Sequence, residues 1–301
     1  MPEWDPEVEV GEDRARTLIE AQFPELAGST VEAVAAGWDN IVYLADGRWA
    51  FRFPRRAIAI PGVEREIATL PRLAAHLPIP VPEPRFIGRP TGEYPWPWFG
   101  APWLPGVELA EAVLADAARA EVAAALGGFL RALHSQHVSR LVGGGLPVDP
   151  MRRGDMGFRV PQVRRRLDNV IARDLWTQTP EVERLLINSA GLPPPPRTVV
   201  LHGDLHVRHV LVDQSRASGV IDWGDVCAGD PSVDLSIAYG CFTGEARAAF
   251  FDAYGPIDRL TELRARVIAT FLAAALLAYA ADEGMAGLEV ESRGALDRVV
   301  T

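Results

Sequence analysis

Lysine is absent from this chain of 301 residues, and all 30 of its basic residues are arginine. With 40 acidic residues, the formal net charge is −10 at pH 7. So acidic a chain lacks the basic surface that neutralises phosphates, and nonspecific binding to nucleic acid is not expected. The absence of lysine also means that any site requiring a cationic side chain, apart from a protonated histidine, must use arginine, whose planar guanidinium can bind phosphate through two hydrogen bonds.

Cysteine is scarce too, with only Cys227 and Cys241, both in apolar surroundings. Two such thiols do not indicate a disulfide framework, and a reducing cytoplasm is expected. Residues 1–5 lack the basic and apolar regions of a secretion signal. No apolar run has the length of a membrane span. The best stretch, residues 267–281, is short and rich in alanine, and we expect it to form a buried helix.

The composition, with 48% hydrophobic and 23% charged residues, is typical of a globular protein. The length allows one large domain or two moderate lobes. Hydrophobic spacing in the first part predicts helices at 13–23 and 63–76 and strands at 31–34, 41–44 and 49–53. The pair Asp46-Gly47 predicts a hairpin turn between the last two strands. Pro71 is expected to kink or break the second helix.

Helical patterns dominate after Leu104-Pro105-Gly106. They predict helices at 121–134, 163–175, 180–189, 232–239, 246–254 and 260–281. The segment 94–99 is expected to form either a strand pair or an aromatic loop. We therefore predict an α+β protein with a small antiparallel-sheet lobe over residues 1–104 and a larger helical lobe over residues 105–301.

The segment His202-Gly203-Asp204 through His209 carries the strongest signal of chemistry. Asp204 stands five residues before His209, the spacing of base and metal ligand in the kinase catalytic-loop pattern H-R-D-x-x-x-x-N. In phosphoryl transfer a carboxylate at this place orients an alcohol and accepts its proton. His202 is expected to bond the backbone of a neighbouring segment.

A second acid, Asp222, follows the apolar run 219–221, where a metal-binding aspartate is expected after a short buried strand. Carboxylate oxygen suits Mg²⁺. His209 is the awkward member, because imidazole nitrogen is softer than an amide oxygen. It is expected either to contact the metal or to hydrogen-bond Asp222. The nearby Asp230 and Asp234 are expected to have structural roles at a helix start.

A zinc site built from His202, Asp204, His206 and His209 is an alternative, because clustered histidines and acids resemble hydrolase ligand sets. It leaves the segment Ile221-Asp222-Trp223 unexplained and is disfavoured for that reason.

Arg52 lies in the expected strand Phe51-Arg52-Phe53, where its side chain should point away from the two phenylalanines. Its partner acid is expected on the following helix, with Glu66 preferred and Glu64 in reserve. A surface charge on a half-exposed strand is the simpler alternative. Trp103 and Leu104, at the joint between the lobes, are candidates for contact with a nucleotide base on position alone.

These motifs resemble those of the antibiotic phosphotransferase family, which includes aminoglycoside and macrolide kinases. The resemblance covers most of the chain and is most specific at 202–206 and 221–235. Members usually carry Asn at the position of His209, and His in the run 207–213 is similar to macrolide 2′-phosphotransferases. The resemblance implies a two-lobed protein-kinase-like fold and a role in antibiotic resistance.

The resemblance also implies roles for individual residues. Asp204 would be the catalytic base, and His209 and Asp222 would hold Mg²⁺. Arg52, where the family commonly has Lys, would position the triphosphate together with Glu66. GTP is implied before ATP as the phosphate donor, because the macrolide branch is associated with GTP.

The acceptor is harder to predict. Few acids occur over residues 260–281, which with His209 favours a macrolide over a polycationic aminoglycoside. The same apolar helix could equally be ordinary core. An aminoglycoside or metabolic kinase of this family, and a nucleotide-binding protein without catalysis, remain alternative functions.

Overall fold

The structure is a computed structural model that describes residues 6–37, 39–195 and 198–301. It has the predicted α+β fold, and the described residues divide into two compact units. The first unit contains the chain up to Ala75, Pro80–Leu104 and Trp223–Val226, whereas the second contains His76–Ile79, Pro105–Asp222 and Cys227–Thr301. Two short segments thus depart from a simple division of the chain after Leu104.

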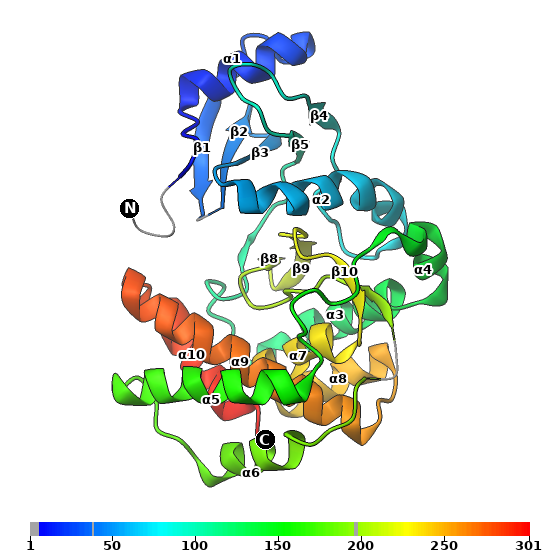
Figure 1. The fold of residues 1–301 in the computed structure, drawn as a ribbon, viewed down its shortest axis with the longest axis vertical. Helices are drawn as coiled ribbons and strands as arrows, with labels where there is room; N and C mark the ends of the chain where they lie inside the picture. The colour runs from blue at the N-terminus through cyan, green and yellow to red at the C-terminus, as the bar shows by residue number, and fades with distance from the viewer. Residues whose placement is uncertain (1–5, 38, 196–197) are drawn as a thin grey trace. The chain divides into compact units, whose positions relative to one another are not determined.

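The first unit is built on an antiparallel sheet of five strands (Figure 1). In spatial order these are β1 (Val31–Ala36), β2 (Asn40–Ala45), β3 (Trp49–Pro54), β5 (Trp98–Pro102) and β4 (Phe86–Gly88). The expected hairpin between β2 and β3 is confirmed, with Asp46 and Gly47 both at positive φ in its turn. The segment before β5 is a loop, in which the hydroxyl of Tyr94 donates to the carbonyl of Pro54 at 2.6 Å.

The two faces of this sheet are covered by different helices. Helix α1 (Glu12–Gln22) contributes to an aromatic core in which Phe53 stacks on Trp98, with 4.7 Å between ring centroids. Helix α2 (Ile60–Leu73) packs against Phe99 on the opposite face. Because cross-strand partners share a face, the pairing of Arg52 with Phe99 places Arg52 on the side of α2. The predicted alternation along β3 is confirmed.

Helix α2 differs from its prediction at both ends. It begins at Ile60 and ends at Leu73, and a 3₁₀ turn then covers Ala74–His76. Pro71 lies in the last turn without ending the helix.

The second unit is mainly helical, and α9 (Arg259–Glu283) lies at its centre (Figure 1). The other helices are α3 (Ala120–Leu133), α4 (Gln136–Val142), α5 (Met156–Ala172), α6 (Pro180–Ser189), α7 (Ser232–Cys241), α8 (Gly244–Tyr254) and α10 (Ala286–Arg298). By length and composition α9 could cross a membrane, but α5, α6, α7 and α10 all pack against it. A buried core helix explains its apolar sequence, as predicted.

Two small sheets in the second unit hold the ends of the motif segments. Strand β7 (Val199–Leu201), which leads into the Asp204 loop, pairs with β10 (Cys227–Gly229). Strands β8 (Val210–Asp213) and β9 (Arg216–Val220) form a hairpin, and β6 (Val107–Glu108) pairs with β8. The loop of residues 202–209 is therefore fixed at both ends by strands.

Two helical features were not anticipated. Helix α5 begins at Met156 instead of residue 163, because Asp155 caps it by accepting a hydrogen bond from the Phe158 amide at 3.2 Å. Pro161 lies inside this helix, and the carbonyl that loses its partner belongs to the exposed Gly157. Helix α10 was missed altogether, because its buried residues are few and partly small or polar.

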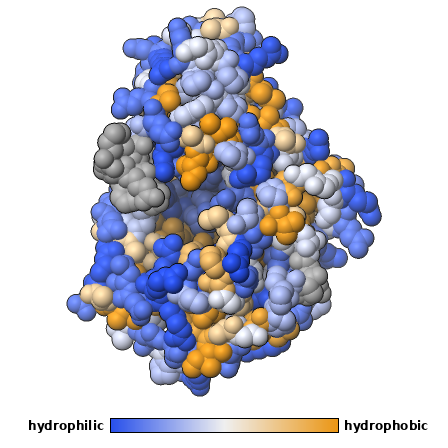
Figure 2. All heavy atoms as spheres, in the orientation of Figure 1, coloured by the Kyte–Doolittle hydropathy of each residue, from blue (hydrophilic) through white to orange (hydrophobic). Residues whose placement is uncertain are grey.

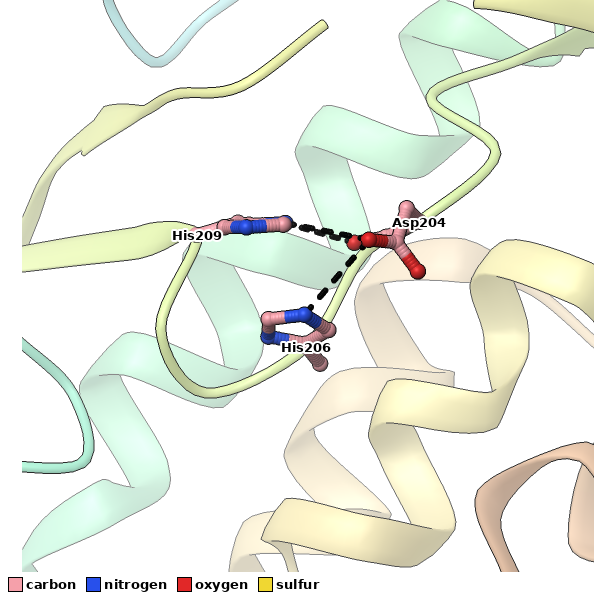
Figure 3. A group of neighbouring side chains, drawn as sticks. All are labelled: Asp204, His206 and His209. Atoms are coloured by element: carbon pink, nitrogen blue, oxygen red, sulfur yellow. Dashed lines mark hydrogen bonds and ion pairs between the residues drawn. The ribbon is translucent and has the colours of Figure 1, made fainter. Parts of the chain in front are cut away.

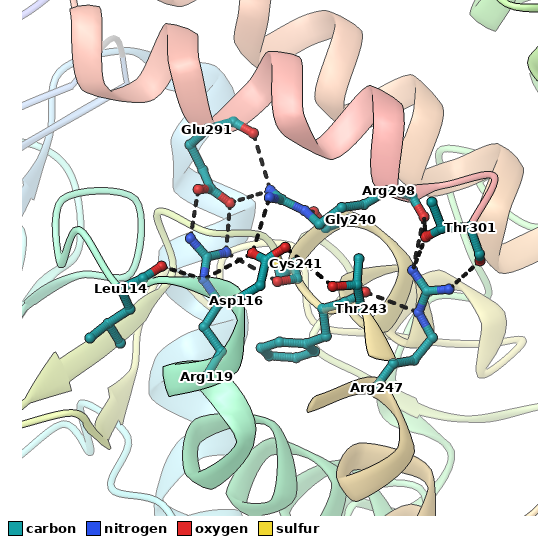
Figure 4. Close-up of polar contacts among 11 residues, drawn as sticks. Leu114, Asp116, Arg119, Gly240, Cys241, Thr243, Arg247, Glu291, Arg298 and Thr301 are labelled. Carbon is teal, nitrogen blue, oxygen red and sulfur yellow. Dashed lines mark hydrogen bonds and ion pairs between the residues drawn. The ribbon is translucent and has the colours of Figure 1, made fainter. Parts of the chain in front are cut away.

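A buried ionic network ties α10 to the rest of the second unit (Figure 4). The guanidinium of Arg119 makes two hydrogen bonds to the carboxylate of Glu291, at 2.8 and 2.7 Å, and a third to the carbonyl of Cys241 at 3.0 Å. Arg298 also pairs with Glu291 and donates to the carbonyl of Gly240. The side chain of Arg119 is only 5% exposed, so its charge depends on these partners.

Elsewhere, the face shown in Figure 2 mixes hydrophilic residues with small hydrophobic groups.

Replacing Arg119 tests this network. We expect Arg119→Ala to lower the free energy of unfolding by about 3 kcal/mol, because the carboxylate of Glu291 loses a principal partner while it stays buried. The measurement is equilibrium unfolding in urea. The control is Arg16→Ala, which removes an exposed pair with Glu12 and should cost less than about 1 kcal/mol. Equal losses in the two variants would contradict the role assigned to Arg119.

Candidate active site

The buried carboxylate of Asp234, in the first turn of α7, shapes the loop that follows β7. It accepts hydrogen bonds from the backbone amides of His202 at 2.8 Å and Gly203 at 2.9 Å, and from Nε2 of His134 at 3.2 Å. Burial would raise the pKa of Asp234, but the hydrogen bond and charge of His134 outweigh it and lower the pKa. Asp234 is therefore an ionised anchor, and its expected structural role is confirmed. Asp230 is structural too, since it accepts from the Ser232 amide at the start of α7.

His202 joins the two motif segments. Its Nε2 donates to the carbonyl of Ile221 at 2.9 Å, and its Nδ1 accepts from the amide of Asp204 at 3.2 Å. Burial lowers the pKa of His202, and His209 lowers it further, so the ring is neutral at pH 7. The expectation that His202 bonds the backbone of a neighbouring segment is confirmed. Because both ring nitrogens are engaged, His202 cannot serve as a metal ligand in this arrangement.

Asp204 lies beside two histidines (Figure 3). Its Oδ2 is 3.6 Å from Nε2 of His206 and 3.9 Å from Nδ1 of His209, and 32% of its side chain is exposed. Burial raises the pKa of Asp204, but the charge and hydrogen bond of His206, followed by the charges of His209 and Arg153, hold the pKa well below its usual range. The carboxylate is ionised at neutral pH and open to a partner on one side.

The ring of His209 is fixed in one orientation and one tautomer. Its Nδ1 donates to the backbone carbonyl of Asp204 at 2.7 Å, because a carbonyl can only accept. Burial lowers the pKa of His209, and His206 lowers it further, so the ring is neutral at pH 7. The lone pair on Nε2 then faces Oδ2 of Asp222 at 3.4 Å.

Two electron-rich atoms so close repel each other unless a cation or a proton lies between them. A cation bound between Nε2 of His209 and Oδ2 of Asp222 would remove this repulsion. The donor set of one imidazole and one carboxylate therefore fits a divalent metal. The backbone of His209 is held as well, because its carbonyl accepts a hydrogen bond from the Ile221 amide at 2.9 Å.

The structure speaks against the zinc alternative. Asp204, His206 and His209 do place ligand atoms within 4.8 Å of one another. However, the rings of His206 and His209 are stacked, with centroids 3.8 Å apart and planes inclined by 30°. Imidazole lone pairs lie in the ring plane, so two stacked rings do not converge on one ion. With His202 also engaged elsewhere, the alternative four-ligand zinc set is not formed.

Asp222 has an unusual backbone conformation, with φ of 62° in the left-handed region. Non-glycine residues adopt this region rarely, and such strain is concentrated at functional sites. The next residue, Trp223, is buried, and its amide donates to Oε1 of Glu66 at 3.1 Å. The guanidinium of Arg65 donates to the carbonyl of Gly224 through Nη2 at 2.5 Å. Helix α2 therefore holds the chain immediately after Asp222.

The ion pair expected between Arg52 and Glu66 is present. Nη1 of Arg52 is 3.3 Å from Oε1 of Glu66, whose side chain is completely buried. The same carboxylate oxygen thus binds both the cation on β3 and the amide of Trp223. The preferred partner Glu66 is confirmed over Glu64, which is exposed. Arg52 is 18% exposed, so the alternative of a plain surface charge is wrong.

Trp103 and Leu104 end the first unit. The amide of Trp103 donates to the carbonyl of Arg48 at 2.8 Å, so this N–H cannot bind a nucleotide base as expected. The side chain of Trp103 is exposed and that of Leu104 is half-buried.

Several residues of the site were not found from the sequence. His134 lies a hundred positions before Asp234, and no local pattern pairs them. Arg153 acts on Asp204 from the loop before α5. His206 was considered only as a zinc ligand, whereas the structure places it beside Asp204. The repeated histidines of 202–209 are the one signal that could have drawn attention to His206.

Solved structures share this fold. Aminoglycoside 2′-phosphotransferase-IIIa in its GDP complex is 21% identical with a TM-score of 0.70, over 95% of this chain and 99% of that one. Macrolide 2′-phosphotransferase MphH from Brachybacterium faecium is 25% identical with a TM-score of 0.59, over 92% and 98%. Macrolide 2′-phosphotransferase type I is 23% identical with a TM-score of 0.61, over 95% and 97%.

Sequence comparison gives one short match and one extensive match. The uncharacterized protein YcbJ of Bacillus subtilis (strain 168) is 39% identical over 51 residues, which span 17% of this chain and only 16% of YcbJ. The sequence model of the phosphotransferase enzyme family matches residues 30–268, well over half of the chain. This chain belongs to the phosphotransferase enzyme family.

Proposed function

We propose that this protein is a small-molecule kinase that transfers the γ-phosphate of a nucleoside triphosphate to an alcohol. The observation that carries the proposal is the convergence of Asp204, His209 and Asp222 in one unit, with a neutral imidazole lone pair opposite a carboxylate. A solvated turn rich in acids and histidines would not need the buried anchor at Asp234. Membership of the phosphotransferase enzyme family supports the same reaction.

Asp204 acts as the base in this proposal. Its carboxylate is ionised and one third exposed, so it can accept a hydrogen bond from the acceptor hydroxyl. The loose transition state of phosphoryl transfer requires an oriented nucleophile more than a strong base, and a low pKa is compatible with that task. His206 holds the carboxylate from one side and acts as a positioning residue.

His209 and Asp222 would hold Mg²⁺, since their facing lone pairs form a site for a cation. When bound, the ion neutralises the negative charge of the nucleotide phosphates. His209 remains anchored by its Nδ1 hydrogen bond whether or not Nε2 has a ligand. The imidazole that would bind the metal is therefore already oriented before the nucleotide binds.

Arg52 would bind the triphosphate, with Glu66 fixing its guanidinium. An arginine can engage phosphate oxygens through two donors while it keeps its ion pair, which a lysine cannot do in the same way. Trp103 and Leu104 are proposed to contact the base through groups other than the Trp103 amide. GTP is proposed before ATP, and the GDP complexes of structurally similar aminoglycoside phosphotransferases are compatible with a guanine nucleotide.

For the acceptor, a sugar hydroxyl of a macrolide antibiotic is supported by His209 and by the likeness to MphH. Resistance would be the biological role, and a cytoplasmic location is supported by two buried cysteines without a disulfide. An aminoglycoside is the alternative supported by other structures of the same fold. A catalytically silent nucleotide-binding protein is disfavoured, because Asp204 and Asp222 are both present.

The reaction is tested by mass spectrometry of a mixed acceptor pool incubated with GTP, ATP and Mg²⁺. The pool contains macrolides, aminoglycosides, amino alcohols and hydroxy acids, and a phosphate adduct is the expected product. Asp204→Asn should lower kcat about a hundredfold or more, because the hydroxyl is no longer oriented by a charged acceptor. Nucleotide affinity should change little.

The matched control is Asp213→Asn, an exposed aspartate at the end of β8, which should leave turnover unchanged. Near-normal turnover of Asp204→Asn would contradict the proposed base. Nucleotide binding without any adduct from the pool would favour the silent protein instead.

The role of Arg52 is tested through the nucleotide. Arg52→Gln should raise KM for the nucleotide about tenfold, because a charged hydrogen bond to phosphate is lost. Arg52→Lys keeps the charge and should retain part of the affinity. Arg48→Gln, in the nearby hairpin turn, is the control and should not alter KM. Thermal unfolding of each variant separates a folding defect from a binding defect. An unchanged KM in a folded Arg52→Gln protein would remove Arg52 from the site.

The metal ligands are tested by titrating activity with Mg²⁺. His209→Ala should raise the half-saturating Mg²⁺ concentration about tenfold, whereas His209→Asn should restore it, because an amide oxygen suits this ion well. His206→Ala is the control: we expect a change in kcat without a change in Mg²⁺ dependence. If His209→Ala and His206→Ala shift the Mg²⁺ dependence equally, His209 is not a ligand.

A further inference from the structure

A cavity of about 630 Å³ lies between α5 and α9, entirely within the second unit. This volume is in the range of sites for drug-sized ligands. Phe271, Ala274 and Ala278 form its wall on α9, and the small alanines leave room beside the phenylalanine. The opposite wall is α5, including its turns before residue 163, where no helix was predicted from the sequence.

The charge of this cavity is one-sided. Four arginines line it, and none of the described lining residues is acidic; the four are Arg152, Arg159, Arg165 and Arg166. Arg159 and Arg166, seven positions apart, lie on one side of α5, and Arg152 comes from the turn before this helix. Because the chain has a net charge of −10, this cluster of arginines is a local feature of the cavity and is not typical of the whole surface.

The arginines are also short of carboxylate partners. Arg152 pairs with Asp155 at 2.6 Å, whereas Arg159, Arg165 and Arg166 make no ion pair within the described part of the chain. An arginine of α5 that lies outside the cavity does have a carboxylate partner. Arg164, on the same helix, pairs with Glu183 through two hydrogen bonds of 2.8 Å.

Arg159 gives the strongest indication of an anion site, because its side chain is buried, with only 5% of the residue exposed. Its guanidinium bonds to neutral oxygens alone, those of Gln162 at 2.7 Å and Met151 at 3.3 Å, and its Nε has no partner. Burial lowers the pKa of Arg159 to about 10, so it is still charged at pH 7. The charge of Asp149 acts on Arg159 and raises its pKa, but these two side chains form no ion pair in the described residues. A buried charge without a close ionic partner is costly, and an anion bound in the cavity would reduce that cost.

Phe271 gives the cavity an aromatic side. The guanidinium carbons of Arg159 and Arg166 lie 4.2 and 4.3 Å from the centre of its ring. These contacts hold both cations in place without neutralising them. The ring and the arginine planes together offer a surface for a flat or apolar body that ends in a negative group.

The loop before α5 connects the cavity to the surroundings of Asp204. Arg152 lines the cavity, and the charge of the next residue, Arg153, helps to lower the pKa of the Asp204 carboxyl group. The cavity wall is therefore one residue away in sequence from a group that acts on the proposed base.

We propose that this arginine-lined cavity binds the phosphate acceptor through an anionic group, so that the acceptor is an apolar or aromatic alcohol that also carries a carboxylate or comparable acid. The inference rests on the proposed phosphoryl transfer. It argues against the macrolide and the aminoglycoside considered above as acceptors, because the amino groups of both are cationic at neutral pH and would face guanidinium groups here. The acid group fixes the acceptor in the cavity, and its hydroxyl extends to Asp204.

Binding is tested first, without turnover, with 2-naphthoate and its neutral counterpart 2-naphthamide in calorimetric titrations. The naphthoate should bind about tenfold more tightly or better, because only it pairs with the arginines. The double variant Arg165→Gln/Arg166→Gln should abolish this preference, whereas Arg164→Gln should preserve it. Both altered arginines are exposed, so the fold should tolerate their replacement. Equal affinity for the two probes in the unaltered protein would overturn the anion site.

Turnover is tested next with hydroxy acids, their methyl esters, erythromycin and kanamycin. Phosphorylation of the acids with a KM about tenfold below that of the esters is expected, and the double variant should raise that KM while kcat stays similar. Phosphorylation of erythromycin or kanamycin alone would overturn the anionic acceptor and leave the kinase proposal standing. Preference for naphthoate with no product from any acceptor would instead overturn the kinase proposal and, with it, the cavity's role as acceptor site.

Discussion

Asp234 is fully buried, and its carboxylate accepts hydrogen bonds from two consecutive backbone amides and from His134. The loop that carries the proposed base depends on this contact. It fixes the backbone of His202 and Gly203, and the next residue is the proposed base. Because His202 then bonds Ile221, the same anchor reaches the segment that ends in Asp222. One buried charge thus organises two motifs that are far apart in the sequence.

In the first unit, the carboxylate of Glu66 likewise connects two segments of the chain. Glu66 binds Arg52 on the sheet and the amide of Trp223, the residue after Asp222. A change at Arg52 therefore acts on the proposed phosphate contact and also on the chain beside the metal ligand. The absence of lysine makes this arrangement possible, because a guanidinium has enough donors to keep its ion pair while it binds another anion.

The fold and the acceptor cavity give different kinds of information. The fold, the catalytic loop and the metal ligands agree with phosphoryl transfer across the phosphotransferase enzyme family. The cavity between α5 and α9 has a chemistry of its own, with an aromatic wall and three arginines that form no ion pair with any residue the structure describes. A shared fold does not fix the substrate, since the side chains that line the site do so. Charge in this cavity is therefore the better guide to the acceptor.

The sequence by itself determined the α+β fold, the hairpin at Asp46-Gly47, the Arg52–Glu66 pair and the motif residues Asp204, His209 and Asp222. These features have local signals: hydrophobic period, turn residues and fixed spacing. Only the tertiary structure decided which ring nitrogen of His209 faces Asp222. It also decided that His202 is no metal ligand, because ring orientation depends on partners distant in sequence. It also extended α5 across Pro161 and so brought Arg159 beside Phe271, a contact between helices that no local pattern encodes.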